Sequence, residues 1–246
     1  MNWDWSVILK YLPRLLEGTW LTLELVAISG IIGIAIALPL ALMRVSSSPW
    51  IRAFPFAYIF FFRGTPLLVQ IFLIYYGASQ FEAVKQSMFW DILKQPYWCA
   101  IIAFSLNTAA YSAELIRGAI QAIPRGEIEA AEALGMSKPL QVRRIVLPRA
   151  FGIVLPAYGN ELILMLKGSS LASTITLLDL TGMARTIIAR TYTPLEIFLA
   201  AGVIYLLISG VFIGAFRLLE KRLNRYQHYR HQVPVELTQI DPRLQD

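Results

Sequence analysis

The sequence predicts an all-α, polytopic membrane protein with five transmembrane helices and a charged elbow between the third and the fourth. Apolar residues make up 57% of the 246 residues and charged residues only 15%, whereas about a quarter is usual in soluble domains. Nearly uncharged runs of about 20 residues, the length that crosses a bilayer, recur along the chain. We expect residues 1–246 to form one membrane domain, in which the single Cys99 excludes an internal disulfide.

The first two predicted spans flank an aromatic segment. The first span, 19–43, carries one acid, Glu24, near its start. Residues 53–62 are rich in Phe and too few to cross, which favours a helix at the membrane interface. In the "RGTP" sequence that follows, Thr65 is expected to cap a new helix with Pro66 at its first position, so the second span is predicted at 66–84.

Three further spans follow. They are predicted at 97–120, 150–171 and 195–216. The fourth is interrupted by Pro156, Gly159 and the triplet "KGS", and it therefore has the composition of a broken helix.

Positive charge predicts the orientation of the spans. With the amino terminus outside, the cytoplasmic segments hold 14 Lys and Arg residues and the outer segments hold 6. The cytoplasmic segments are 44–52, 117–150 and 217–246, and the outer ones are 1–18, 78–96 and 172–194. This bias predicts an outer amino terminus and a cytoplasmic carboxyl terminus, with a polar tail at 219–246 that is expected to become disordered. The net charge of +6 thus reflects topology, and no nucleic-acid partner is expected.

A charged stretch, 127–148, separates the third span from the fourth. Its first part is rich in strong helix formers, and Gly135 is the residue expected just past a helix end, because glycine adopts positive φ without strain. Ser137 is expected to cap a second helix that Pro148 ends. A helix-turn-helix of this kind on the cytoplasmic side is either an ordinary solvated loop or a docking surface for a protein partner.

Several motifs resemble one transporter family. Glu129, Ala130 and Ala131, followed by Gly135 and then by "IVLP" from Ile145, resemble the EAA signature of ABC importer permeases. The stretches "FRGTPLLVQIFLIYYG", "NTAAYSAE", "GEIEAAEALGM" and "LPAYGNELILMLKGSSLA" resemble the polar amino-acid permeases, in particular the histidine, arginine, ornithine and octopine branch.

The resemblance implies an assembly in the bacterial inner membrane. Two permease subunits pair, two ATPase subunits bind the EAA loops from the cytoplasm, and a periplasmic binding protein delivers the substrate. The charged elbow is then a coupling helix that carries the motion of the ATPase into the membrane. The residues expected to shape it are Glu127, Glu129, Ala130, Ala131, Gly135, Ser137 and Arg143.

The chain itself is not expected to be an enzyme. No G-x-x-x-x-G-K-[ST] sequence occurs, so ATP and its Mg²⁺ are expected in a partner ATPase. The only histidines, His228 and His231, lie in the polar tail, and no metal site or other cofactor is expected.

Polar side chains inside the spans are candidates for the substrate path, because they are costly in a membrane. They lie in the third and fourth spans: Asn107, Tyr111, Glu114, Asn160, Glu161, Lys167, Ser169 and Ser170. Two have ordinary alternatives: Glu114 can pair with Arg117, and the Lys167 side chain can extend to the membrane surface.

We therefore expect a permease subunit that forms the translocation path for polar amino acids. The resemblance favours basic substrates such as arginine, ornithine, lysine, histidine or an opine. The alternatives are a secondary transporter driven by an ion gradient and a membrane scaffold. The elbow has no purpose in the first, and the intramembrane carboxylates are unexplained in the second.

Overall fold

The computed structural model describes residues 5–223 and contains only helices and turns within that range. In chain order the helices are α1 (Trp5–Arg44), α2 (Pro49–Gly64), α3 (Leu67–Phe72), η1 (Leu73–Gly77), α4 (Glu82–Lys85), α5 (Trp90–Leu93), α6 (Pro96–Gln121), α7 (Arg125–Ala133), α8 (Lys138–Gln141), η2 (Val142–Val146), α9 (Leu147–Gly168), η3 (Ser169–Ile175), α10 (Leu180–Thr191) and α11 (Pro194–Leu223). Here η1 and η2 are π-helical and η3 is a 3₁₀-helix.

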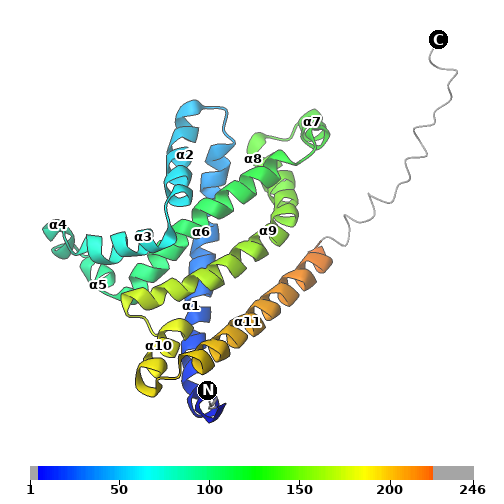
Figure 1. Cartoon of the computed structure of the whole chain (residues 1–246). Helices are drawn as coiled ribbons and strands as arrows, with labels where there is room; N and C mark the ends of the chain where they lie inside the picture. Colours follow the sequence, from blue (N-terminus) through cyan, green and yellow to red (C-terminus); the bar gives the residue numbers. More distant parts are fainter. Residues whose placement is uncertain (1–4, 224–246) are drawn as a thin grey trace.

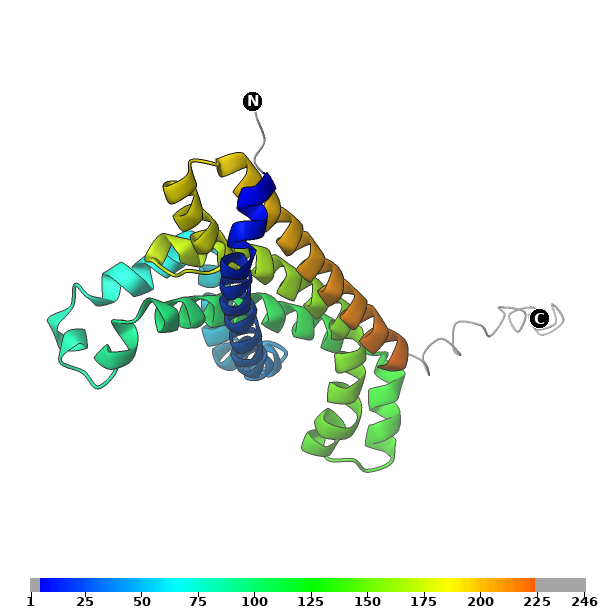
Figure 2. The ribbon, with the colours of Figure 1, turned by 90° about the horizontal axis from the view of Figure 1, so that it is seen from below.

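Five spans fit the described part of the chain, which confirms the predicted fold class. Four helices are long and apolar enough to cross a membrane, and α2 with α3–η1, which are bent by 105°, make a fifth when the pair is counted as one span. The α1–α2 turn and the α7–α8 elbow lie at the top of Figure 1, whereas α10 and the start of α1 lie at the bottom. From below, the elbow projects at one end of the molecule and the α4–α5 segment projects at the other (Figure 2).

α6 is the central helix, and α1 packs along it (Figure 1). Small residues on α6 let the two backbones approach, and they are Ala100, Ala103, Ser105, Thr108, Ala109, Ser112 and Ala113, all of them buried. At 40 residues, or about 60 Å, α1 is far longer than the predicted span 19–43. Hydropathy predicts the uncharged part of a helix, and α1 begins earlier, in turns that carry Lys10, Arg14 and Glu17.

The second span differs from the prediction. Thr65 does not cap a helix: it ends α2 in an extended conformation, and its hydroxyl donates to the Phe61 carbonyl at 2.8 Å. Pro66 is extended as well, so α3 begins at Leu67. A residue before proline is driven out of the helical region, which explains the break. The aromatic segment lies in α2, which packs beside α1 and α6 and which, together with α3–η1, is long and apolar enough for one bent span.

The predicted stop at Pro148 is also wrong. The helix runs without interruption from Lys138 to Ile175, through Pro148 and Pro156. The π-turn η2 ends at Val146, two residues before Pro148, and its changed hydrogen-bond register lets the helix continue through a residue that has no N–H to donate. The only change of helix type after Pro148 is at Ser169, within the "KGS" triplet, where the helix narrows to η3.

The segment after η3 is held by a buried acid. Asp179 accepts hydrogen bonds from the backbone N–H groups of Thr181 and Gly182, both at 3.2 Å, and thereby caps α10. Gly182 has no room for a side chain, because a Cβ there would lie 2.1 Å from the Leu177 carbonyl oxygen.

We therefore expect Gly182→Ala to lower the free energy of unfolding by about 1–3 kcal/mol, since the backbone must shift to admit the methyl group. The control is Gly202→Ala on α11, where a Cβ meets no atom within 4 Å and alanine favours the helix. Cys99, the only cysteine, is fully buried, so a thiol-reactive dye reports thermal unfolding in detergent. Equal melting temperatures for the two variants would contradict the packing described for Gly182.

Candidate functional site

The break between α2 and α3 is supported by two amide side chains. Gln70 is only 2% exposed, and its Nε2 donates to the carbonyl oxygens of Phe62 at 2.9 Å and Thr65 at 3.0 Å. Asn107 on α6 donates to Gln70 Oε1 at 3.0 Å and to the Phe62 carbonyl at 3.3 Å. Carbonyl groups at a helix end have no partner within the helix, and these amides satisfy them. Asn107 therefore fixes the bent span against α6.

Beside this break lies a pocket of about 190 Å³ between α3, α6 and α9. It is lined by Leu67, Phe104, Asn107, Thr108, Tyr111, Glu161, Leu164 and Met165. Three of the predicted path residues thus meet here: Asn107, Tyr111 and Glu161. Glu161 is half-buried and forms no salt bridge with any residue in the range 5–223, although Arg63 acts on it electrostatically.

A second pocket, of about 430 Å³, adjoins the first through Tyr111. It lies between α1, α2 and α6 and is lined by Arg44, Phe56, Ile59, Phe60, Arg63, Gly64, Tyr111 and Glu114. The Arg63 guanidinium lies 5.2 Å from the centre of the Tyr111 ring, and that of Arg44 lies 5.2 Å from the Phe56 ring. Cation–π contacts of this kind hold both arginines at the wall of the pocket.

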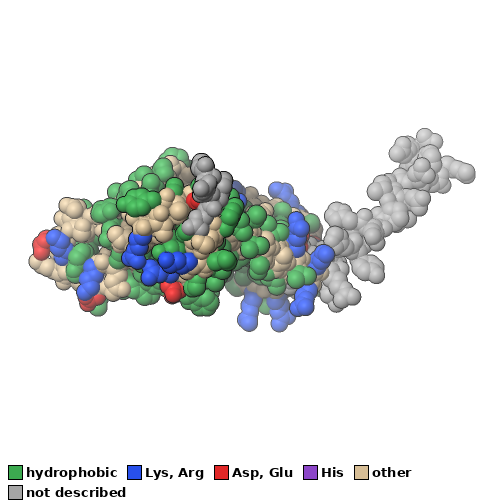
Figure 3. Space-filling model, turned by 60° about the horizontal axis from the view of Figure 1, so that its bottom comes forward, with side chains coloured by type: hydrophobic (Ala, Val, Ile, Leu, Met, Phe, Trp, Pro, Cys, Tyr) green, Lys and Arg blue, Asp and Glu red, His purple; other side chains and the backbone are tan. Residues whose placement is uncertain are grey.

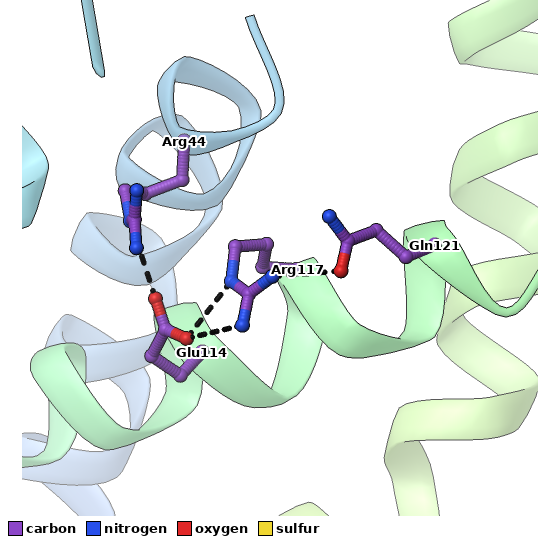
Figure 4. A network of polar contacts seen from close by, with 4 residues as sticks. All are labelled: Arg44, Glu114, Arg117 and Gln121. Carbon is purple, nitrogen blue, oxygen red and sulfur yellow. Dashed lines mark hydrogen bonds and ion pairs between the residues drawn. The ribbon is translucent and has the colours of Figure 1, made fainter.

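Glu114 is engaged in an ion-pair network (Figure 4). Its carboxylate contacts Arg44 at 3.3 Å and Arg117 at 2.7 Å, and Arg117 also donates to Gln121 at 2.7 Å. The network joins the end of α1 to α6. Pairing with Arg117 is the alternative that the sequence offered for Glu114, and the structure adds Arg44, which is 70 residues away in the chain.

Four predicted path residues line neither pocket. Asn160 and Lys167 are exposed, and the hydroxyl groups of Ser169 and Ser170 donate to carbonyls three residues earlier, at 2.7 and 2.8 Å. Adjacent helical residues point about 100° apart, so Asn160 does not share the face of Glu161.

The sequence analysis missed three residues of these pockets and of the break: Arg44, Arg63 and Gln70. Arg63 and Gln70 are polar residues in the otherwise apolar segment 53–77, and that signal could have identified them.

The charged elbow closes with a Schellman motif. Gly135 has φ +72°, as predicted from its type and position. The N–H of Met136 donates to the Ala131 carbonyl at 3.0 Å, and that of Gly135 donates to the Glu132 carbonyl at 2.9 Å. Ser137 precedes α8 in an extended conformation, as expected of a cap residue, although its side chain makes no cap hydrogen bond. The elbow thus has a defined turn.

The inner side of the elbow is attached to the spans. Arg149 at the start of α9 forms a two-pronged ion pair with Glu127 on α7, with Nε to Oε2 at 2.9 Å. The Gln141 side chain donates to the Met136 carbonyl at 2.8 Å, and Ala131 is buried. The other predicted elbow residues, Glu129, Ala130, Gly135, Ser137 and Arg143, are exposed. Leu134 at the tip is 82% exposed, so the elbow presents an open outer face.

Within residues 5–223 no group of three or more His, Cys, Asp and Glu side chains is placed to hold a metal ion. His228 and His231, which the sequence analysis placed in the polar tail, lie outside the described residues.

Comparison with known proteins gives the class of protein. Residues 29–225 match the family described as "Binding-protein-dependent transport system inner membrane component", and the chain belongs to this family. It is therefore a multi-pass inner-membrane permease subunit, as predicted, and neither the ion-driven transporter nor the scaffold has support. Its relatives are transport permeases, in keeping with the prediction that the chain itself is not an enzyme.

Three relatives show the branch. The chain is 47% identical to the nopaline transport system permease protein NocM of Agrobacterium fabrum, over 92% of this chain and 95% of that relative. It is 50% identical to the octopine permease OccM of Rhizobium meliloti, over 84% of each. It is 46% identical to the histidine/lysine/arginine/ornithine permease HisM of Escherichia coli K12, over 83% of this chain and 87% of HisM.

Two kinds of solved structure have the same fold. The chain matches the crystal structure of an amino acid ABC transporter with histidines, with a TM-score of 0.80 and 36% identity, over 90% of this chain and all of the other. The MetNI methionine ABC transporter, at 18% identity and a TM-score of 0.73 over 87% of this chain and 98% of the other, shares the fold.

Proposed function

We propose that the chain forms half of the translocation path of an ATP-driven ABC importer for polar amino acids, and that its elbow binds an ATPase subunit. The elbow is the observation that carries this proposal: its inner side is fixed to α9 by the Glu127–Arg149 pair, while its outer face is open. Such an element can receive a partner and pass on its displacement. The assembly then comprises two ATPases, which hold ATP and Mg²⁺, a second permease, identical or homologous, and a periplasmic binding protein.

The two pockets are the proposed path for the substrate. A basic amino acid carries two cationic groups, the α-ammonium and the side chain, and one carboxylate, and the pockets offer an acidic and a basic side chain. Glu161, with no salt bridge among the described residues, takes the cation. Arg63, held over Tyr111, takes the carboxylate in place of the expected Lys167, which lies outside both pockets.

The relatives support this class of substrate. The permeases NocM, OccM and HisM are named for nopaline, for octopine and for histidine, lysine, arginine and ornithine. The proposed substrate is therefore a basic amino acid or an opine.

Topology gives the first test. The 14 to 6 division of Lys and Arg supports the proposal that the amino terminus is periplasmic and the carboxyl terminus cytoplasmic. Reporter fusions are expected to place Gln86, between α4 and α5, outside and Ser137, at the start of α8, inside, because α6 separates them. A fusion that reports Ser137 outside would rule out both the orientation and the ATPase contact.

Energy coupling between the elbow and the ATPase gives the second test. Gly135→Val is expected to reduce ATP-driven uptake in the reconstituted complex by roughly fivefold or more, because valine at φ +72° adds about 1–3 kcal/mol of strain to the turn. Gly135→Asn is the control, since asparagine tolerates this conformation. Both variants should insert normally, as the spans are unchanged. Equal uptake by the two variants counts against the docking role.

The dependence of uptake on the charge of the substrate gives the third test. In a low-dielectric pocket, removal of one partner of a charge pair costs about 2–5 kcal/mol, so Glu161→Gln should lower arginine uptake by roughly 30-fold or more. Uptake of citrulline, which has a similar shape but a neutral side chain, should change far less. The matched control is Glu24→Gln: this α1 acid is hydrogen-bonded to Tyr97 at 2.5 Å and lines neither pocket.

The ratio of the two substrates separates a binding role from a structural one. If Glu161→Gln lowers arginine and citrulline uptake equally at matched permease levels, the carboxylate is structural and the site assignment is wrong.

A further inference from the structure

One open face of α9 carries polar side chains inside a predicted span. The helix packs against α6, α11 and α1 through its other sides. From Gly152 to the end of α9 the exposed residues are Ile153, Asn160, Leu164 and Lys167. At 100° per residue these four lie within roughly 60° of one another around the helix axis. They therefore form a single stripe, the α9 stripe, that no other helix in the range 5–223 covers.

Asn160 lies at the middle of the predicted span 150–171. Its side chain forms no hydrogen bond with any residue in the described part of the chain. Hydrocarbon offers an amide neither a donor nor an acceptor, so an exposed amide at the centre of a bilayer is strongly disfavoured. Polar side chains within a span instead face other protein or a water-filled cavity. The α9 stripe is therefore not a surface for lipid.

The outer surface of α11 shows the contrast. Every exposed residue of α11 between Phe198 and Ala215 is apolar or a glycine, and Ser209 in the same stretch is buried. The basic side chains of α11 begin only at Arg217, at the end of the molecule where Lys and Arg side chains gather in Figure 3. A face of this composition suits lipid along its whole length, whereas the α9 stripe does not.

From this contrast we infer that the second permease packs on the α9 stripe and presents a hydrogen-bonding side chain to Asn160. The inference rests on the proposed function, in which the ATPases bind from the cytoplasm and the binding protein from the periplasm. Only the second permease then lies within the membrane, at the depth of Asn160. Asparagine side chains form such hydrogen bonds between membrane helices and thereby fix which faces meet.

This contact also completes the polar pocket. Leu164 is 62% exposed, and it lines the pocket that contains Glu161. A helix that covers Leu164 therefore adds a wall that one chain alone does not supply. Lys167 lies two turns beyond Asn160, near the end of the predicted span, and its side chain can extend to the membrane surface along the edge of the contact.

Photo-cross-linking in the complex, purified from its own membranes by a tag on this chain, is the direct test. Benzoylphenylalanine would replace Ile153 or Leu164 on the stripe, and Leu206 on α11 as the control, since Leu206 is 70% exposed on the apolar face. Both stripe positions should give an adduct between two permease subunits, at a yield at least fivefold above that at Leu206.

The amide is tested by two substitutions that act in opposite ways. Asn160→Leu should lower the amount of second permease that co-purifies with the tagged chain at least threefold, because the hydrogen bond is lost. On a face toward lipid, leucine would be the better residue and pairing would not change. Asn160→Gln keeps an amide and should restore part of the pairing. The melting temperature of the chain alone, followed by dye labelling of the buried Cys99, should not fall in either variant.

Three results would overturn the inference. They are equal cross-linking at Leu164 and Leu206, unchanged pairing of Asn160→Leu, and rapid modification of Asn160→Cys in the assembled complex by a charged methanethiosulfonate. The last would place the residue in a water-filled path. The transport function stands in each case if the unsubstituted complex takes up substrate with ATP. If no second permease co-purifies with the unsubstituted chain, both the proposed function and this inference are wrong.

Discussion

The requirement that every buried backbone polar group find a partner inside the membrane shapes this protein at its centre. Between α2 and α3 the span breaks, and lipid offers no water to the carbonyl groups that the break releases. Gln70 and Asn107 satisfy them, and in doing so they lock the bent span to α6. The polar pocket lies directly beside this junction, because Asn107 belongs both to the support and to the pocket wall. The residues that satisfy the break between α2 and α3 thus also help to form the polar pocket.

The same requirement for partners sorts the intramembrane charges into two groups. Glu114 is satisfied by two arginines and joins α1 to α6, and Glu24 is satisfied by the Tyr97 hydroxyl. Glu161 and Arg63 instead face the pockets without a salt bridge among the described residues. A charge kept in a membrane without a salt-bridge partner has a cost that function must justify, and this contrast singles out Glu161.

Local chemistry was predictable from the sequence, and long-range packing was not. The five spans follow from composition, and the positive φ of Gly135 follows from a rule about the residue after a helix end. The partner of Glu114 on α1 depends on how α1 crosses α6, which no local pattern encodes. The position of Asn160 off the pocket face, by contrast, follows from helical periodicity once Glu161 is on it. Proline was the weakest signal, since Pro66 produced a bend within one span and Pro148 lies inside a helix that a π-turn carries past it.

The error at Pro148 changes what the elbow can do under the proposed function. Had the helix stopped there, a flexible joint would separate the elbow from the fourth span. Instead α8, η2 and α9 form one continuous helix. This helix contains Gln141, which is hydrogen-bonded within the elbow turn, and Glu161, which lines the pocket. These two residues are 20 positions apart, or about 30 Å along the helix. The Glu127–Arg149 ion pair joins α7 to the same continuous helix. Under the proposed function, a displacement of the elbow by an ATPase is therefore transmitted to the wall of the pocket along this continuous helix.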